Sequence, residues 1–295
     1  MSSNLTGCSS GMGKALSLLI LAKGQRLVAT ARKLSGLSYL PTNSPNLLTL
    51  SLDVTSSSTI DAAVDTAIAR FGRIDVMVNN AGFSYRGDTE NASLPVARNL
   101  FETNFWGTVL LTTHAMRIMR SVNPQSGPIG GCILNITSMG GRVAFQGNAY
   151  YHASKFAVEG FTESVSKEVR PEWGIHFCCV EPGGVKTNYV KTGRERAIPV
   201  HEAYEGEDSP TRRVERYLED EEAMKGWADA EVVVERIWEL VEGGEVPLRV
   251  PLGGDAWGVL RREYEQYTEE LERWREFSVS AGKGGQLESI DFLGK

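Results

Sequence analysis

Short apolar runs alternate with helix-like stretches along the chain as far as Val180. The expected strands are Arg26–Thr30, Leu47–Val54, Ile74–Asn79, Cys132–Thr137 and Ile175–Val180. The expected helices cover residues 13–23, 58–71, 95–120 and 149–170. Strands that are apolar throughout and separated by helices form parallel βαβ units, in which helices cover both faces of the sheet. The pattern therefore predicts an α/β fold with a Rossmann-type doubly wound parallel sheet.

The pattern changes after Pro182-Gly183. Residues 188–226 are charged and weakly periodic, which is typical of a solvated surface excursion and also suits a lid over a substrate pocket. We expect a helix over Asp229–Val241, a short strand over Leu248–Pro251 and an amphipathic helix over Asp255–Glu276. The apolar stripe of that last helix is expected to pack in the core. It consists of Ala256, Leu260, Tyr264, Tyr267, Leu271 and Trp274.

The predicted organisation is a single domain. Residues 1–187 form its dinucleotide-binding and catalytic core, residues 188–277 form the substrate lid and C-terminal helical part, and residues 278–295 form a loose tail. The first strand is the weak point of this prediction, because only the largely polar residues 1–5 precede the glycine-rich segment. A short polar strand at the centre of the sheet should weaken the core. Either the protein tolerates such a short first strand, or the true start of the protein lies upstream.

Composition narrows the function classes. A 295-residue chain with 41% hydrophobic residues can build a substantial core, and a net charge of −6 argues against a nucleic-acid partner. The apolar stretch Ala15–Ala22 is too short for a transmembrane segment, so we expect it to be the first helix. The four cysteines lack metal-ligand spacing, which favours free thiols and a cytoplasmic location.

The segment Thr6–Gly13 reads TGCSSGMG and stands directly before the first expected helix. Glycines let the backbone turn sharply and approach a pyrophosphate, and a helix N-terminus offers unpaired N–H groups. A dinucleotide site here would be lined by residues of this loop. They are Gly7, Ser9, Ser10, Gly11, Met12 and Gly13.

Tyr151 and Lys155 lie four residues apart on an expected helix and therefore share one face. An ammonium beside a phenol favours the phenolate and should lower the pKa of Tyr151. The neighbouring Tyr150 points about 100° away around the helix. A Tyr-x-x-x-Lys pair by itself is common on helix surfaces. Whether this pair has a functional role must therefore be judged from the other motifs.

Taken together, these motifs resemble those of the classical short-chain dehydrogenases/reductases, most closely over residues 4–190. The resemblance rests on the glycine loop, on Asn79-Asn80-Ala81-Gly82 and on the Tyr151–Lys155 pair. It implies a catalytic set of Asn104, Ser138, Tyr151 and Lys155. It further implies cofactor contacts from Asn80, Gly183, Val185 and Thr187, and an adenine contact from Asp53.

In carbonyl reduction, Ser138 would donate a hydrogen bond to the developing oxyanion and Tyr151 would protonate it as general acid. The resemblance implies that Lys155 also binds the nicotinamide ribose and that Asn104 holds a water linking Lys155 to solvent. Oxidation of an alcohol reverses these roles. The nicotinamide supplies the hydride, so no metal is expected.

The end of the second expected strand indicates the cofactor. An acid there would bind the 2′-hydroxyl of NAD, whereas Arg suits the 2′-phosphate of NADP. The chain carries Arg32 and no acid at this place, which favours NADP(H) over NAD(H). Arg32 and Lys33 could instead merely cap a loop.

Several apolar side chains flank the motifs and could line a substrate pocket or serve ordinary packing. They are Phe83, Tyr85, Met139, Phe145, Tyr189 and Val190. With residues 251–256, they resemble the branch of the family that acts on steroid-like, retinoid-like or polyketide-type substrates.

The sequence thus predicts an NADP(H)-dependent oxidoreductase for an apolar ketone, aldehyde or alcohol of small or medium size. The alternatives are a non-catalytic nucleotide-sensing or scaffold protein, and a lyase or epimerase, on the same fold. A homodimer or homotetramer is expected through the small residues Ala153, Ala157, Gly160 and Ser164, although these could equally pack on the sheet.

Overall fold

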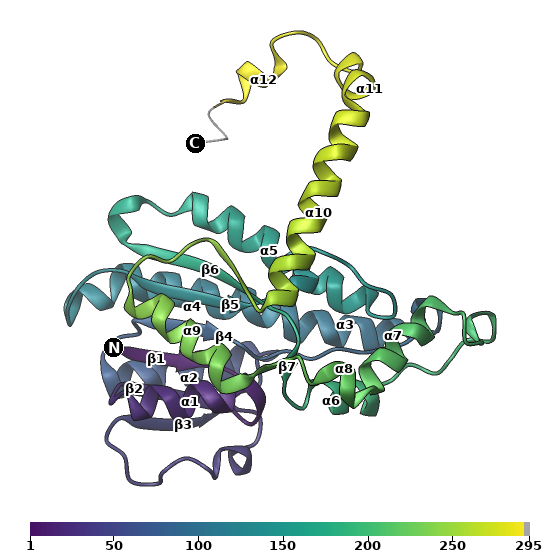
Figure 1. Ribbon diagram of the computed structural model, residues 1–295. Coiled ribbons are helices and arrows are strands. Elements are labelled where there is room, and N and C mark those ends of the chain that lie inside the picture. The colour runs from purple at the N-terminus through teal and green to yellow at the C-terminus, as the bar shows by residue number, and fades with distance from the viewer. Residues whose placement is uncertain (292–295) are drawn as a thin grey trace.

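A seven-stranded parallel sheet runs through the centre of the molecule in the computed structural model, which describes residues 1–291 (Figure 1). Its strand order is β3-β2-β1-β4-β5-β6-β9, and each neighbouring pair is parallel. The strands are β1 Ser2–Leu5, β2 Arg26–Ala31, β3 Leu47–Ser51, β4 Val76–Asn79, β5 Gly131–Ile136, β6 Ile175–Pro182 and β9 Arg249–Leu252. The predicted doubly wound sheet is confirmed.

Helices cover both faces of the sheet. On one face α1 (Gly11–Ala22) and α9 (Ala230–Glu242) pack through Leu16, Ile20 and Ile237. On the other face lie α2 (Ser57–Phe71), α4 (Gly107–Ser121) and α5 (Ala149–Glu168). These two cores bury apolar side chains on each side of the strands, which is the main stabilising contribution in such a fold.

The first strand forms in full despite its polar sequence. Ser2, Ser3 and Asn4 are buried, and β1 pairs in register with β2 on one side and β4 on the other. The backbone hydrogen bonds of a central strand do not depend on its side chains, so a polar strand of four residues can complete the sheet. One unfavourable feature of β1 is a side chain, since Asn4 Oδ1 is buried without a hydrogen-bond partner.

The single helix expected over residues 95–120 is interrupted. The structure has α3 (Leu94–Phe101), then a π-helical turn over Glu102–Trp106, then α4. Single π turns inside helices occur frequently at functional sites. This turn contains Asn104, one of the predicted catalytic residues.

Between β6 and β9 the chain leaves the sheet and forms a short helical excursion. It contains α6 (Tyr189–Glu195), α7 (Pro210–Glu219) and α8 (Glu221–Met224). A small parallel pair closes its base, formed by β7 (Val185–Lys186) and β8 (Ala228–Asp229). Figure 1 shows this excursion beside the end of the sheet at which the loops after β4 and β5 lie.

The prediction for the last long helix is wrong in its outer part. In α10 (Gly254–Arg273) Ala256 and Leu260 are buried, but the rest of the apolar stripe is exposed, comprising Tyr264, Tyr267, Leu271 and Trp274. Figure 1 shows the cause, since α10 projects away from the body of the molecule and only its first turns reach the core.

The expected loose tail also contains helices. They are α11 (Arg275–Ser280) and α12 (Gln286–Ser289), and positions 292–295 of the tail lie outside the described residues. No helix within residues 1–291 is long and apolar enough to cross a membrane.

Candidate active site

The site lies at the carboxyl end of the central strands, where the loops after β1, β4, β5 and β6 come together. The chain crosses from one side of the sheet to the other between β1 and β4, and open α/β sheets bind ligands at such a switch point. Two adjoining cavities occupy this edge of the sheet, of about 370 and 290 Å³.

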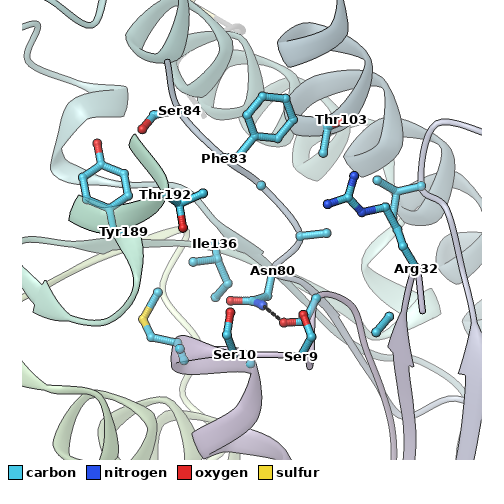
Figure 2. Close-up of a pocket in the computed structure, with 18 of the residues that line it drawn as sticks. Ser9, Ser10, Arg32, Asn80, Phe83, Ser84, Thr103, Ile136, Tyr189 and Thr192 are labelled. Atoms are coloured by element: carbon cyan, nitrogen blue, oxygen red, sulfur yellow. Dashed lines mark hydrogen bonds between the residues drawn. The ribbon is translucent and has the colours of Figure 1, made fainter. Parts of the chain in front are cut away.

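The glycine-rich loop forms a cradle at the N-terminus of α1. Gly7 and Gly11 have positive φ angles of 69° and 54°, which glycine adopts without strain. A Cβ on Gly13 would lie 2.3 Å from the Gly7 carbonyl oxygen, so no larger residue fits there. The Asn80 amide secures the loop by donating to the carbonyls of Thr6 (2.8 Å) and Gly7 (3.2 Å) (Figure 2). The loop therefore has the shape and the free N–H groups that a pyrophosphate requires.

The larger cavity gathers most of the residues predicted to bind the cofactor. Figure 2 shows Ser9 and Ser10 on its floor, Arg32 at one end and Tyr189 at the other. Of the predicted set, its lining includes Gly7, Ser9, Ser10, Gly11, Met12, Gly13, Arg32, Asp53, Asn80, Tyr151, Lys155 and Thr187. Gly183 and Val185 line the smaller cavity instead. The chain thus offers an elongated polar site that fits a dinucleotide.

Arg32 and Asp53 lie at the end of this cavity remote from Tyr151. Asp53 Oδ1 accepts hydrogen bonds from the Thr55 amide (3.0 Å) and the Thr55 hydroxyl (2.8 Å). These bonds, together with the charge of Arg32, lower the pKa of Asp53 below its ordinary value. Arg32 is exposed and free to meet an incoming anion, whereas Lys33 is absent from the cavity lining.

Tyr151 stands at the boundary between the two cavities. The residues that line both are Met12, Thr137, Tyr151, Thr187 and Tyr189. Ser138 lines the smaller cavity and makes a hydrogen bond with Tyr151. Its Oγ accepts from the Gly140 amide at 3.0 Å and donates to the Pro182 carbonyl at 3.5 Å.

Lys155 lies behind Tyr151, in the larger cavity. Its Nζ donates to the Ile136 carbonyl at 2.7 Å and lies 5.8 Å from the centre of the Tyr151 ring. Burial lowers the pKa of Lys155 to about 8, against the opposing influence of Glu159 and Cys179. A lysine with such a pKa exchanges its proton readily near neutral pH.

The expected lowering of the Tyr151 pKa is not observed. Burial raises the pKa of the phenol and Tyr189 adds to this, while the Ser138 hydrogen bond and the charge of Arg86 lower it. Lys155 was expected to provide the main lowering, but its ammonium is held by the Ile136 carbonyl at the rear of the ring. In this geometry Tyr151 is a protonated phenol, the form that a general acid requires.

Asn104 is buried behind the cavities rather than in their walls. Its side chain bonds both the amide (3.0 Å) and the carbonyl (2.9 Å) of Phe83, and it donates to the Ser154 hydroxyl at 3.1 Å. The backbone carbonyl of Asn104 accepts a hydrogen bond from the Thr108 hydroxyl at 3.0 Å. Asn104 therefore joins the loop after β4 to helix α5, and thereby holds the helix that carries Tyr151.

The smaller cavity has a mainly apolar wall built from several regions of the chain. Met139 and Phe145 come from the loop after β5, and Tyr189 begins α6. Other apolar side chains in the wall include Met12, Pro182, Val185, Val214, Tyr217, Leu218 and Trp227. Of the apolar residues predicted to line a pocket, Met139, Phe145 and Tyr189 line this cavity, and Phe83 lines the larger one. The prediction is wrong for Tyr85 and Val190, which line neither cavity.

Sequence reasoning missed several residues of this cavity. Val214, Tyr217 and Leu218 stand at the i, i+3, i+4 spacing of a helix that presents one apolar face, a signal hidden by the surrounding charges. The role of Asp255 was also missed. Its carboxylate accepts a hydrogen bond from the Gly184 amide at 2.6 Å and so fixes the turn after β6. Asn148 and His152 also line the cavity without having been predicted.

Comparison with known proteins agrees with this architecture. The family model described as short chain dehydrogenase matches residues 4–197, more than half of the chain. The chain belongs to the short-chain dehydrogenase family. It is therefore an oxidoreductase of a family that binds NAD(P)(H).

Relatives match over almost the whole of the chain. Oxidoreductase calM of Penicillium decumbens is 44% identical over 281 residues, covering 93% of this chain and 91% of its own. A solved short-chain dehydrogenase from Streptomyces avermitilis superposes with a TM-score of 0.81 at 31% identity, covering 95% of this chain and 99% of its own. A Burkholderia phymatum short-chain dehydrogenase/reductase in complex with NAD shares the fold, with a TM-score of 0.74 at 22% identity and coverage of 91% and 94%.

Proposed function

We propose that this short-chain dehydrogenase interconverts a ketone or aldehyde and an alcohol, with NADP(H) as cofactor and Tyr151 as general acid/base. The observation that carries the proposal is the place of Tyr151, between a polar cavity that begins at the glycine loop and an apolar cavity that contains Ser138. A reacting carbonyl must lie where cofactor and substrate meet, and the phenol stands at that boundary.

The residues divide the chemistry of carbonyl reduction among them. Ser138 turns its hydroxyl hydrogen from the Pro182 carbonyl, 3.5 Å away, to the substrate oxygen and stabilises the charge that develops there. Tyr151 donates the proton to that oxygen. Lys155 keeps a readily exchanged proton behind Tyr151, and Asn104 fixes α5 relative to the loop after β4. The family's NAD(P)(H) supplies the hydride when bound.

The apolar wall of the smaller cavity indicates the substrate class. Phe145, Leu218 and Trp227 suit a small or medium apolar carbonyl compound, of the steroid-like, retinoid-like or polyketide type. The excursion that contains α6, α7 and α8 serves as a lid in this proposal, since its side chains form one side of that cavity.

Replacing Tyr151 with Phe tests the chemistry directly. We expect Tyr151→Phe to lower kcat by roughly 100- to 10,000-fold, because general acid–base catalysis contributes a factor of that size. Binding of NADPH, followed by thermal shift, should remain. Tyr150→Phe is the matched control, since Tyr150 lies out of register on the same helix and lines neither cavity. A Tyr151→Phe enzyme that still reduces its ketone at the normal rate would contradict the assignment.

The proposed preference for NADP(H) rests on Arg32 and is tested separately. A cofactor present at about 100 times its dissociation constant stabilises the fold by roughly 2.7 kcal/mol. We expect NADPH to raise the melting temperature more than NADH does at equal concentration, and Arg32→Ala to remove the difference. Equal shifts with both cofactors in the unsubstituted protein would overturn the preference. Consumption of added NADPH with substrate would also separate a reductase from a lyase or epimerase.

Assembly and location belong to the same proposal. Ala153, Gly160 and Ser164 are exposed on α5 next to the exposed ring of Phe156, and such a flat face permits close packing of a second copy. We therefore expect a homodimer or homotetramer formed through α5. The four cysteines are free and buried, which suits a cytoplasmic enzyme.

A further inference from the structure

Helix α7 covers the smaller cavity but has few polar ties to the body of the protein. Its side chains Val214, Tyr217 and Leu218 form part of the cavity wall. Apart from one ion pair, the ion pairs and side-chain hydrogen bonds of α7 that involve the described residues lie within the excursion of residues 188–227. The place of this wall over the cavity therefore depends strongly on that one pair.

The pair joins Arg212, in the first turn of α7, to Asp88 in the loop after β4. Arg212 Nη2 lies 3.0 Å from Asp88 Oδ1, and the two side chains are 13% and 0% exposed. The other carboxylate oxygen, Asp88 Oδ2, accepts from the His201 amide at 3.2 Å, so one buried carboxylate holds two parts of the excursion. Removal of one partner from a buried ion pair is costly, because the remaining charge is left unpaired in the interior.

The ion pair lies where α7 meets the catalytic part of the chain. Thr211, the neighbour of Arg212, packs against Gly147, where a Cβ would lie 2.9 Å from Thr211 Cγ2. The Gly147 carbonyl accepts from the Gly87 amide at 3.1 Å, directly before Asp88. The first turn of α7 therefore rests on the loop after β4 and on the turn that leads into α5.

We infer that Asp88 and Arg212 are positioning residues for the substrate, because their ion pair holds the apolar wall of α7 closed over the smaller cavity. Neither side chain lines the two cavities of the site, so the pair acts through α7 and not by touching the substrate. The substrates that depend on the pair are those whose apolar part is long enough to reach Val214 and Leu218. This inference rests on the proposed function and specifies what sets its preference for larger apolar compounds.

The kinetic consequence follows from the populations of the closed and open positions of α7. A protein whose binding-competent state is only partly populated binds its ligand more weakly by that fraction. Without the ion pair, the binding of an apolar substrate must itself close α7, which weakens its apparent affinity. The KM for such a substrate should therefore rise while kcat at saturation is kept, since Tyr151 and Ser138 are unchanged.

The kinetic test measures kcat and KM with NADPH for the 2-alkanones from butanone to decanone. We expect Arg212→Met to raise the KM for decanone roughly 10- to 100-fold, and the KM for butanone much less, because the short ketone does not reach α7. Arg212→Lys keeps a cation at this position and should give a smaller rise. Arg213→Met is the matched control, since Arg213 is the next residue of α7, is exposed and forms no ion pair within residues 1–291.

Hydrogen exchange of the α7 amides, followed by mass spectrometry, reports the position of the helix without any turnover. Arg212→Met should speed exchange over residues 210–219 and leave α4 and α5 protected. Asp88→Asn should have the same effect, and the double variant should add little to either single one, because the ion pair is already broken. The Kd of NADPH should stay the same in all of these variants.

The two measurements separate the levels of the argument. Unchanged exchange of α7 in Arg212→Met would overturn the inference, as would a KM that rises equally for butanone and decanone or for neither. If no ketone is reduced but α7 exchanges faster in the variants, the reductase assignment fails and the role of the pair in holding α7 stands. If Arg212→Met reduces decanone with the normal KM, the role of the pair fails and the reductase assignment stands.

Discussion

Unpaired polar atoms mark both the site and a weakness of the core. Near the candidate active site they belong to Ser84, Arg86, Asn148 and His152. Asn4 is different, because it lies in the middle of the sheet between β2 and β4 and its Oδ1 has no partner. A buried unsatisfied carbonyl there costs free energy without any evident gain in function.

Asn4→Val should therefore stabilise the fold. Removing the unsatisfied amide and adding a β-branched side chain should raise the free energy of unfolding by about 1–3 kcal/mol, measured by urea denaturation. Asn135→Val is the matched control on β5. The Asn135 amide accepts from Asn79 and donates to Thr162, both at 2.8 Å, so the same change there should destabilise the protein. Destabilisation by Asn4→Val would show that its side chain has a partner in solution.

At the residue level, spacing predicts some roles and not others. The glycines of residues 7–13 and the pair Tyr151–Lys155 were recognisable because their chemistry depends on fixed intervals along the chain. The direction of the shift in the Tyr151 pKa was predicted wrongly, because burial and Tyr189 raise that pKa and no interval along the chain reveals either effect. His152 was overlooked for the same reason, since only the folded chain places it in the wall of the smaller cavity.

Among the elements, helix α6 has the closest relation to the site. Tyr189 at its start lies between the Arg86 guanidinium, 4.9 Å from its ring centre, and the tilted Tyr151 ring, whose centre is 6.1 Å away. The Arg86 carbonyl accepts from Ile198 at 2.6 Å, and a Cβ on Gly193 would lie 2.8 Å from Arg86 Nε. A buried arginine thus lies under α6, separated by the Tyr189 ring from the proposed catalytic phenol of Tyr151.

Arg86→Met should alter the pH profile of the enzyme. The charge of Arg86 lowers the pKa of Tyr151, so its removal should raise that pKa further. In the oxidation of an alcohol, which needs the phenolate, the rise of kcat/KM with pH should then move to higher pH. Arg194→Met is the control, because Arg194 on α6 is exposed and pairs with Glu219 at 3.1 Å. An unchanged profile for Arg86→Met would mean that its charge is screened from Tyr151.

Element boundaries were predictable where the apolar pattern alone decides them. The strands β2, β5 and β6 begin or end within a few residues of the expected positions, because buried parallel strands are apolar throughout. The π turn at Asn104 was not predictable from that pattern, since it depends on side-chain bonds to Phe83 and Ser154. The same limit applies to α10, whose amphipathic stripe does not indicate how far the helix extends beyond the core.

For the whole molecule, pH acts through a buried carboxyl pair that joins β6 to α5. Glu181 and Glu159 are both almost fully buried, and Arg249 bonds Glu159 at 3.0 Å and Glu163 at 2.6 Å. Burial, with the nearby Glu159 carboxylate, raises the pKa of Glu181 from 4.5 to about 7, while Arg142 and Arg249 oppose the rise. The native protein therefore keeps a proton on Glu181 at pH values where the unfolded chain has released it.

Glu181→Gln should remove a pH-dependent loss of stability. Because the native pKa of Glu181 is raised, the contribution of its carboxyl group to the free energy of unfolding is fully present below pH 4.5. This contribution is lost as the pH rises toward 7. The variant should keep its stability across that window and exceed the unsubstituted protein by about 3 kcal/mol at pH 8, measured by urea denaturation at a series of pH values. Glu163→Gln is the control with the opposite sign, since bonds from Lys167 and Arg249 lower the pKa of Glu163 to about 2. Glu163→Gln should lower the free energy of unfolding at neutral pH. It should leave unchanged the loss of stability that occurs between pH 4.5 and 7. If Glu181→Gln and the unsubstituted protein follow parallel curves through that window, Glu181 is already ionised in the native state and the inference of a raised pKa is wrong.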